Sequence, residues 1–160
     1  MSTEKKPNRV CSFCGYAELD VIMDFGKVAL AGAFLAEENF HSERKYQMDF
    51  CFCSNCFAVQ IAEAIPADTL FKDYFYFSSS IGTLRDHFES YAKEISSRFL
   101  EPGKSTVLEF GCNDGVLLRP LADEKIRTVI GVDPAYNVIS NINDERIVTI
   151  NDYFTEGVAE

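Results

Sequence analysis

Apolar and polar residues follow different periodicities along the chain, and each periodicity predicts a different element. Alternation over Met48–Cys53 predicts a β-strand, and the apolar segment Ala58–Ala62 predicts another. Between Ile81 and Leu100 the apolar residues recur every three or four positions, which predicts a helix with one apolar stripe. That stripe consists of Leu84, Phe88, Tyr91, Ile95 and Phe99. Ser80 is expected to be the N-cap of this helix, and Pro102-Gly103 to follow its end.

The last third of the chain alternates between strand and helix patterns. Buried strands are expected at Ser105–Phe110, Thr128–Val132 and Ile147–Ile150, and helices are expected to begin near Val116 and Ala135. A β-α-β-α-β order with short links is typical of a parallel, doubly wound sheet. The sequence therefore predicts an α+β N-terminal region followed by a partial α/β, Rossmann-like domain.

Composition excludes several classes of partner and compartment. The 160 residues include 25 acidic and 15 basic side chains, for a formal net charge of −10. This balance disfavours nucleic acid and anionic membrane surfaces, which bind through Lys and Arg. No segment has the roughly 18–20 consecutive apolar residues of a membrane helix, and the polar stretch Met1–Arg9 does not resemble a signal peptide. We therefore expect a cytoplasmic protein whose thiols are reduced.

Four of the six cysteines form two pairs with the spacing of metal ligands. Cys11 and Cys14 form one C-x-x-C pair, and Cys53 and Cys56 form the other. Each pair can bring two thiolates to one ion, and together they would complete the closed tetrahedral shell of a structural Zn²⁺. Gly15 follows the first pair, where the backbone must turn. The residue after the second pair is Phe57, which departs from that pattern.

Two alternatives remain for the cysteines. A single C-x-x-C pair can be a redox-active dithiol, although two such pairs favour a metal site. Cys51 lies two residues before Cys53 and so shares its strand face. It could replace one of the ligands, but the interpretation as a small buried side chain is favoured.

The turn after the first strand of the last third has the features of a cofactor loop. It reads Glu109-Phe-Gly111-Cys-Asn113-Asp-Gly115, and its glycines would let the backbone approach a ligand. Asp133, at the end of the following strand, suits a ribose diol. Asn113 stands at the middle position of an E-x-G-x-G-x-G pattern, where Asn tolerates a left-handed backbone.

This loop favours S-adenosylmethionine over a dinucleotide. A dinucleotide loop typically has the pattern G-x-G-x-x-G, which brings a pyrophosphate to the helix N-terminus. Glu109 would repel a pyrophosphate, whereas it suits a cofactor with a cationic amino-acid end. A nicotinamide-dependent enzyme and a purely structural turn remain as alternatives.

Four motifs in a fixed order carry a resemblance to a known family. They are Cys11-x-x-Cys14-Gly15, Cys53-x-x-Cys56-x-x-x-Gln60, Tyr74-Phe-Tyr76-Phe-Ser78-Ser79, and the loop 109–115. The chain resembles the sugar C-methyltransferases that carry an N-terminal zinc domain and act on nucleotide-linked keto-deoxysugars. The resemblance covers nearly the whole chain.

The resemblance implies methyl transfer from S-adenosylmethionine to a carbon atom of a nucleotide-sugar. In this family a base removes a proton beside the keto group, and the enolate attacks the methyl group. Glu109, Gly111, Asn113, Gly115 and Asp133 would line the cofactor. Tyr74 or Tyr76 would face the sugar and assist proton transfer, with core packing as the alternative for each; the base itself is not identified.

The chain also departs from this family, whose class I methyltransferase sheet normally has seven strands. The sequence divides into a zinc-binding domain (1–66), an aromatic segment with a connecting helix (67–103), and an incomplete methyltransferase domain (104–160). We expect this chain alone to be weakly active or inactive, as part of a longer protein or as a degenerate relative. The unpaired edge of an incomplete sheet predicts self-association. A non-enzymatic, zinc-dependent docking module is the main alternative.

Overall fold

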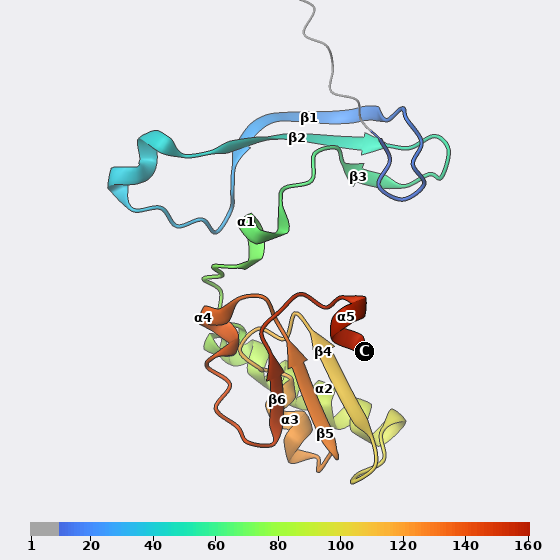
Figure 1. Ribbon diagram of the computed structural model, residues 1–160, viewed down its shortest axis with the longest axis vertical. Helices are drawn as coiled ribbons and strands as arrows, with labels where there is room; N and C mark the ends of the chain where they lie inside the picture. Colours follow the sequence, from blue (N-terminus) through green and yellow to red (C-terminus); the bar gives the residue numbers. More distant parts are fainter. Residues whose placement is uncertain (1–9) are drawn as a thin grey trace, which may run out of the picture. The chain divides into compact units, whose positions relative to one another are not determined.

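A computed structural model describes residues 10–160, and its contacts divide the chain into two units, Met1–Pro66 and Ala67–Glu160 (Figure 1). Each unit is described by itself below. The polar stretch Met1–Arg9, on which the expected localisation partly rests, lies outside the described residues. Within residues 10–160, none of the helices combines the length and apolarity needed to cross a membrane.

The first unit is built on an antiparallel sheet with the strand order β1-β2-β3. Its strands are β1 (Asp20–Ala29), β2 (Lys45–Phe52) and β3 (Val59–Ile61), and a 3-10 helix η1 (Glu37–Ser42) lies between β1 and β2. The pairing of β1 with β2 is irregular around Gly26, which has a φ of 69°. The amide of Gly26 donates to the Asp24 carboxylate at 2.7 Å, and this local bond stabilises the bulge.

The first unit buries very few side chains. Its buried residues, within 10–66, are Cys11, Tyr46, Asp49, Cys51 and Cys53. Three of these five are cysteines, and only one is a large apolar residue. A core of this size does not offset the conformational entropy of folding, so a unit of this kind needs a disulfide or a metal ion.

The second unit is a parallel sheet with the strand order β4-β5-β6, and helices cover one face of it (Figure 1). Its strands are β4 (Thr106–Phe110), β5 (Thr128–Val132) and β6 (Ile147–Ile150). Its helices are α1 (Ala67–Phe71), α2 (Gly82–Phe99), α3 (Leu118–Asp123), α4 (Tyr136–Ile139) and α5 (Glu156–Ala159), with a 3-10 turn η2 (Ser78–Ser80) before α2. The alternation of strand and helix confirms the predicted partial α/β fold.

The core of the second unit lies between one face of this sheet and helices α2 and α3. Val107, Val129 and Ile147 are in register across the three strands and pack toward Leu118 and Leu121 of α3. The opposite face carries the next row, in which Leu108 is 39% exposed and Val148 is 52% exposed. Parallel sheets are usually covered on both faces, and within the described residues this second face is not covered.

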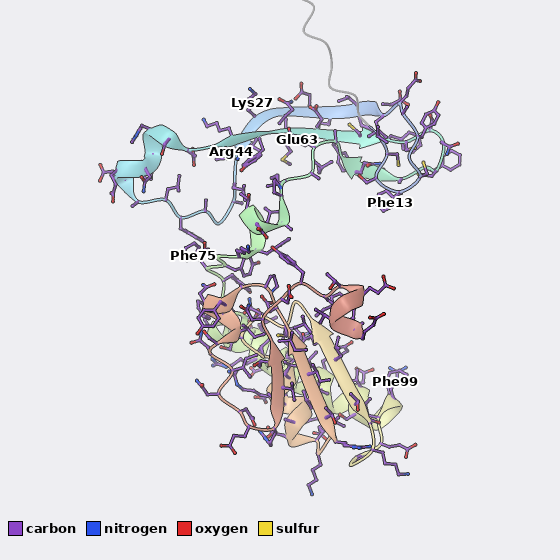
Figure 2. All side chains as sticks on the ribbon, viewed as in Figure 1. Phe13, Lys27, Arg44, Glu63, Phe75 and Phe99 are labelled. Atoms are coloured by element: carbon purple, nitrogen blue, oxygen red, sulfur yellow. The ribbon has the colours of Figure 1, made fainter. Side chains whose placement is uncertain are left out.

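The start of α2 and its apolar stripe differ from the prediction. Ile81, not Ser80, is the N-cap, because the Ser80 hydroxyl donates to the carbonyl of Phe77 inside η2. Tyr91 and Phe99 of the predicted stripe are exposed, and Phe99 lies at the outer edge of the unit (Figure 2). The fully buried position is Ala92, since a small side chain lets α2 approach α3 closely and leaves the larger rings at the flank.

Candidate metal centre and cofactor cavity

Two turns with the same hydrogen-bonding pattern present the four cysteines. The amides of Cys11 and Cys53 each donate to the carbonyl five residues later, at 2.8 and 2.9 Å. The amides of Gly15 and Phe57 donate back to the carbonyls of these cysteines, at 2.9 and 2.8 Å. Gly15 has a φ of 74° and Phe57 a φ of 61°. Phe57 therefore adopts the left-handed backbone that glycine provides in the first turn.

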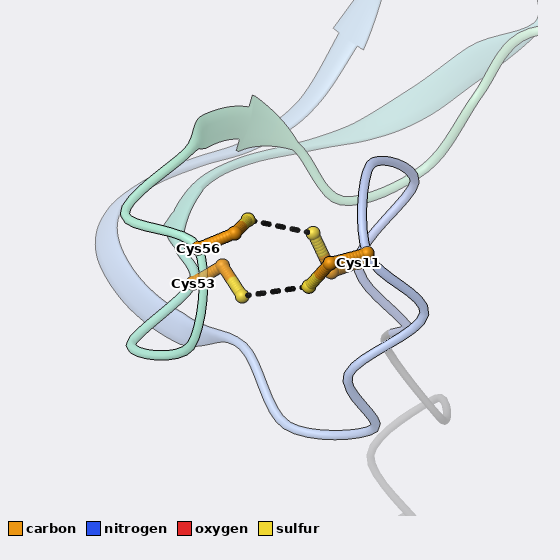
Figure 3. A group of neighbouring side chains, drawn as sticks. Cys11, Cys53 and Cys56 are labelled. Atoms are coloured by element: carbon orange, nitrogen blue, oxygen red, sulfur yellow. Dashed lines mark hydrogen bonds between the residues drawn. The ribbon is translucent and has the colours of Figure 1, made fainter.

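The four thiols converge on one point in the first unit (Figure 3). The Sγ atoms of Cys11, Cys14, Cys53 and Cys56 all lie within 4.8 Å of one another, and the pairs Cys11–Cys56 and Cys14–Cys53 are 3.6 Å apart. Four sulfurs at Zn–S distances of about 2.3 Å would be separated by about 3.8 Å, so this spacing fits a tetrahedral thiolate shell. Cys51 is fully buried but is not part of the cluster found among the described residues.

Two side-chain amides donate to the sulfurs of this cluster. Gln60 Nε2 lies 3.1 Å from Cys11 Sγ, and Gln60 Oε1 accepts from the amide of Ser12 at 2.9 Å. Asn55 Nδ2 lies 3.5 Å from Cys14 Sγ, and this hydrogen bond is the main cause of the lowered pKa of Cys14. Such donors stabilise thiolates and orient them toward a metal. The sequence predicts no role for either amide, although Gln60 belongs to the motif Cys53-x-x-Cys56-x-x-x-Gln60.

The second unit contains a cavity of about 490 Å³ at the carboxyl ends of its parallel strands. Six of its fourteen lining residues are aromatic: Phe71, Tyr74, Tyr76, Phe110, Tyr153 and Phe154. Its charged lining residues within 10–160 are two carboxylates, Asp133 and Asp152, and no Lys or Arg is among them. Ligands of open α/β sheets bind at this edge, and the cavity favours a ligand that is apolar in part and carries positive charge.

The predicted cofactor loop passes beside this cavity, but only some of its residues line the cavity. Gly111 lines the cavity with a φ of 69°, and a Cβ there would project into open space. Gly115 has a φ of 76°, and a Cβ there would lie 3.1 Å from Ile142, so packing explains this glycine. Asn113 lines the cavity with a φ of 53°. Neither Glu109 nor Gly115 is among the described residues that line it.

Asp133 joins the ends of the strands and also lines the cavity. Its Oδ2 accepts from the amide of Asn113 at 2.8 Å, and its Oδ1 accepts from the amide of Ala135 at 2.9 Å. Its carbonyl accepts from Asn151 Nδ2 at 2.9 Å. The carboxylate is 7% exposed and retains further lone pairs for a ligand hydroxyl. It therefore fixes the backbone of two loops whether or not it contacts a ligand.

Below the loop, the carboxyl group of Glu109 has no cationic partner among the described residues. Its Oε2 is buried and makes no hydrogen bond, and burial together with the charge of Asp133 raises its pKa to about 7. The neighbouring thiol of Cys112 is 1% exposed, and burial followed by the nearby carboxylates raises its pKa to about 12. Cys112 is consequently a neutral packing residue, whereas Glu109 would be stabilised by a positive charge nearby.

Tyr74 and Tyr76 are brought together at the cavity wall. Their ring centroids are 6.5 Å apart in an edge-to-face arrangement, and the side chains are 38% and 44% exposed. The structure adds residues that the sequence analysis did not assign to the site. Phe110 and Phe154 stack at 5.4 Å. Asp152, which also lines the cavity, lies two residues after the end of β6, and Asp133 lies one residue after the end of β5. The repeated strand-Asp order was the signal that could have identified Asp152.

A four-cysteine metal-binding unit joined to an α/β cofactor domain defines the class of this protein, and comparisons with known proteins agree. Residues 11–71 match a family described as a zinc binding domain, and residues 84–156 match a methyltransferase domain. The chain therefore combines, in this order, a segment similar to a zinc binding domain and a segment similar to a methyltransferase domain.

A characterised relative is the C-methyltransferase NovU of Streptomyces niveus. It is 31% identical over 156 residues, which cover 97% of this chain and 37% of NovU. The chain thus spans well under half the length of this relative.

Proposed function

We propose that this chain carries a structural zinc site and the cofactor cavity of an S-adenosylmethionine-dependent C-methyltransferase that acts on a nucleotide-linked keto-deoxysugar. The observation that carries the proposal is the acidic, aromatic cavity at the carboxyl ends of β4, β5 and β6. The name of NovU and the four sequence motifs support transfer to carbon.

The cysteine cluster supports zinc in a structural role. Four thiols at mutual distances within 4.8 Å form a closed donor set, which leaves no ligand position for substrate. Soft thiolates in a tetrahedral arrangement select Zn²⁺ among the common divalent ions. Such a site requires reduced cysteines, which supports a cytoplasmic location.

The charges around the cavity support a sulfonium cofactor over a dinucleotide. Asp133 and Asp152 line it, and Glu109 lies nearby with a buried, unpartnered oxygen. A pyrophosphate would add two negative charges to this group of carboxylates, whereas a cationic sulfur and an amino group would compensate them. Aromatic rings also attract a desolvated cation through their π faces.

The residues of the chain would prepare a substrate carbon for methylation. S-adenosylmethionine supplies an electrophilic methyl group on a positively charged sulfur. Loss of the proton beside the keto group would leave the electron pair of the broken C–H bond to form the new C–C bond, while the methyl–sulfur bond breaks and its electron pair stays on the departing, neutral sulfur. Tyr74 and Tyr76 both line the cavity, and we expect the hydroxyl group of one of them to assist that proton transfer.

Calorimetric titration of the full chain with S-adenosylhomocysteine tests this proposal, after metal analysis shows one zinc per chain. We expect binding, weaker binding in Asp133→Asn, and no binding of NAD. Asp86→Asn removes one carboxylate from the exposed face of α2 and is the matched control. Binding of NAD alone would favour a nicotinamide-dependent enzyme. Binding of neither ligand by a folded, zinc-loaded chain would favour the docking module.

A further inference from the structure

The segment Tyr74–Ser79, here called the aromatic strap, forms one wall of the cavity without regular secondary structure of its own. Its residues 74–77 belong to neither helix nor strand, and a single 3-10 turn follows. Backbone N–H and C=O groups in such a segment need partners from elsewhere. Side chains of the loop after β4 and of α4 bind the backbone of Tyr74, Tyr76, Ser78 and Ser79. The carbonyls of Phe77 and Ser78 accept from the backbone amides of Ser80 and Ile81.

Two asparagines each hold the strap with both atoms of the side-chain amide. Asn113 Oδ1 accepts from the amide of Ser78 at 2.9 Å, and Asn113 Nδ2 donates to the carbonyl of Tyr76 at 2.9 Å. Asn137 Oδ1 accepts from the amide of Tyr74 at 3.3 Å, and Asn137 Nδ2 donates to the carbonyl of that same residue at 2.7 Å. Each amide therefore replaces the pair of bonds that a neighbouring β-strand would make.

Other contacts secure the end of the strap and connect the two asparagines. The carboxylate of Asp114, 2% exposed, accepts from the amide of Ser79 at 3.2 Å and from its hydroxyl. Asp133 binds the backbone amide of Asn113, in the loop after β4, and that of Ala135, the N-cap of the helix α4 that carries Asn137. The strap, the loop after β4 and the loop before α4 thus form one hydrogen-bonded network around the cavity.

We propose that Asn113 and Asn137 are positioning residues that hold the aromatic strap as a fixed wall of the cavity. Their amides place Tyr74 and Tyr76 and thereby set the affinity for an adenosine-containing ligand. The effect on ligand affinity rests on the proposed function, whereas the holding of the strap does not. Asn113 consequently does more than tolerate the left-handed backbone of a glycine-rich loop.

The substitution Asn113→Gly separates these two explanations. Glycine keeps the left-handed backbone available at φ 53° and removes only the side-chain amide. Asn137→Ala removes the second amide, and Asn143→Ala is the matched control for an exposed asparagine after α4. Hydrogen exchange measured by NMR on the ligand-free chain then reports on each strap amide separately.

Asn113→Gly should accelerate exchange at Ser78, and Asn137→Ala at Tyr74, each by about tenfold for the loss of one net hydrogen bond. The Ser79 amide, bound by Asp114, should keep its protection in both variants. Unchanged exchange, or equal acceleration throughout the second unit, would overturn the proposal, since a general loss of stability would not be selective for one amide.

The same variants should weaken binding of S-adenosylhomocysteine several-fold with no comparable change in Tm, while Asn143→Ala binds like the wild type. If the strap amides exchange faster but the affinity for S-adenosylhomocysteine is unchanged, the proposed effect of the strap on ligand affinity is overturned. If the wild-type chain does not bind this ligand, the proposed function fails, and the exchange measurement still tests the holding of the strap.

Discussion

At the scale of single residues, Phe57 carries backbone strain that its counterpart Gly15 does not. Both follow a cysteine pair with positive φ, at 61° and 74°. An L-residue in the left-handed conformation costs about 1–2 kcal/mol. Replacing it with glycine removes this strain but costs about 0.5–1 kcal/mol, because glycine loses more conformational entropy on folding. The ring of Phe57 is 75% exposed, and its contact with the ring of Phe52 is a tilted one with the centroids 6.2 Å apart.

Phe57→Gly should therefore raise the free energy of unfolding of the zinc-loaded first unit by about 0.5–1 kcal/mol. Denaturant unfolding measures this change. Phe13→Gly is the control, because Phe13 is equally exposed, at 73%, but does not have a positive φ. That control should lose stability. A decrease in the free energy of unfolding in both variants would show that the left-handed conformation of Phe57 is not strained.

Glu109 should make stability depend on pH. Its pKa is raised from the ordinary value of 4.5 to about 7 by burial and by Asp133. The unfolded chain releases this proton near pH 4.5 and the folded chain near pH 7, so stability is lost as pH rises between these values.

Glu109→Gln removes the ionisable carboxyl group and with it the loss of stability at higher pH. Its stabilisation relative to wild type should grow from roughly 1 kcal/mol near pH 5.5 to at most about 3 kcal/mol near pH 8. Urea unfolding of both proteins at the two pH values measures this difference, and Glu94→Gln on the exposed face of α2 is the control. A difference that does not vary with pH would contradict the raised pKa.

At the scale of elements, the approach of α3 to β5 depends on Gly131. A Cβ at this position would lie 2.5 Å from Leu118 Cδ1 and 2.8 Å from Cys112 Sγ. Both neighbours are buried and cannot move without disturbing the core, so Gly131→Ala should destabilise the second unit by about 1–3 kcal/mol. Gly157→Ala in α5, where a Cβ meets nothing within 4 Å, is the control and should be close to neutral. Equal Tm values for the two variants would contradict this packing.

The sequence predicted elements better than it predicted which side chains meet. Periodicity located the three strands of the second unit, because a run such as Thr128–Val132 has a local signal. The spacing of the cysteines indicated the metal cluster for the same reason. Asn137 had no local signal, because its partner Tyr74 lies 63 residues away. Gln60 belonged to a cysteine motif, but its bond to Cys11, 49 residues away, had no local signal. The burial of Ala92 instead of Tyr91 likewise depends on the neighbouring helix α3, which periodicity does not describe.

At the scale of the whole molecule, the two units derive stability from different sources. The hydrophobic core cluster lies entirely in the second unit, within the described residues. The first unit has five buried residues, three of them cysteines, and four convergent thiols. Binding of a metal to such a set supplies folding free energy directly.

Removal of the metal should therefore unfold the first unit and leave the second folded. After treatment with a chelator, hydrogen exchange should show loss of protection in β2 (Lys45–Phe52) and retained protection in β5 (Thr128–Val132). Cys14→Ala should reproduce this pattern and lose zinc. Cys51→Ala is the matched control, because Cys51 is a buried cysteine of the same unit outside the cluster, and it should keep one zinc per chain. Retained protection of β2 in the metal-free chain would show that the small core suffices. Loss of zinc in Cys51→Ala would instead place that thiol among the ligands.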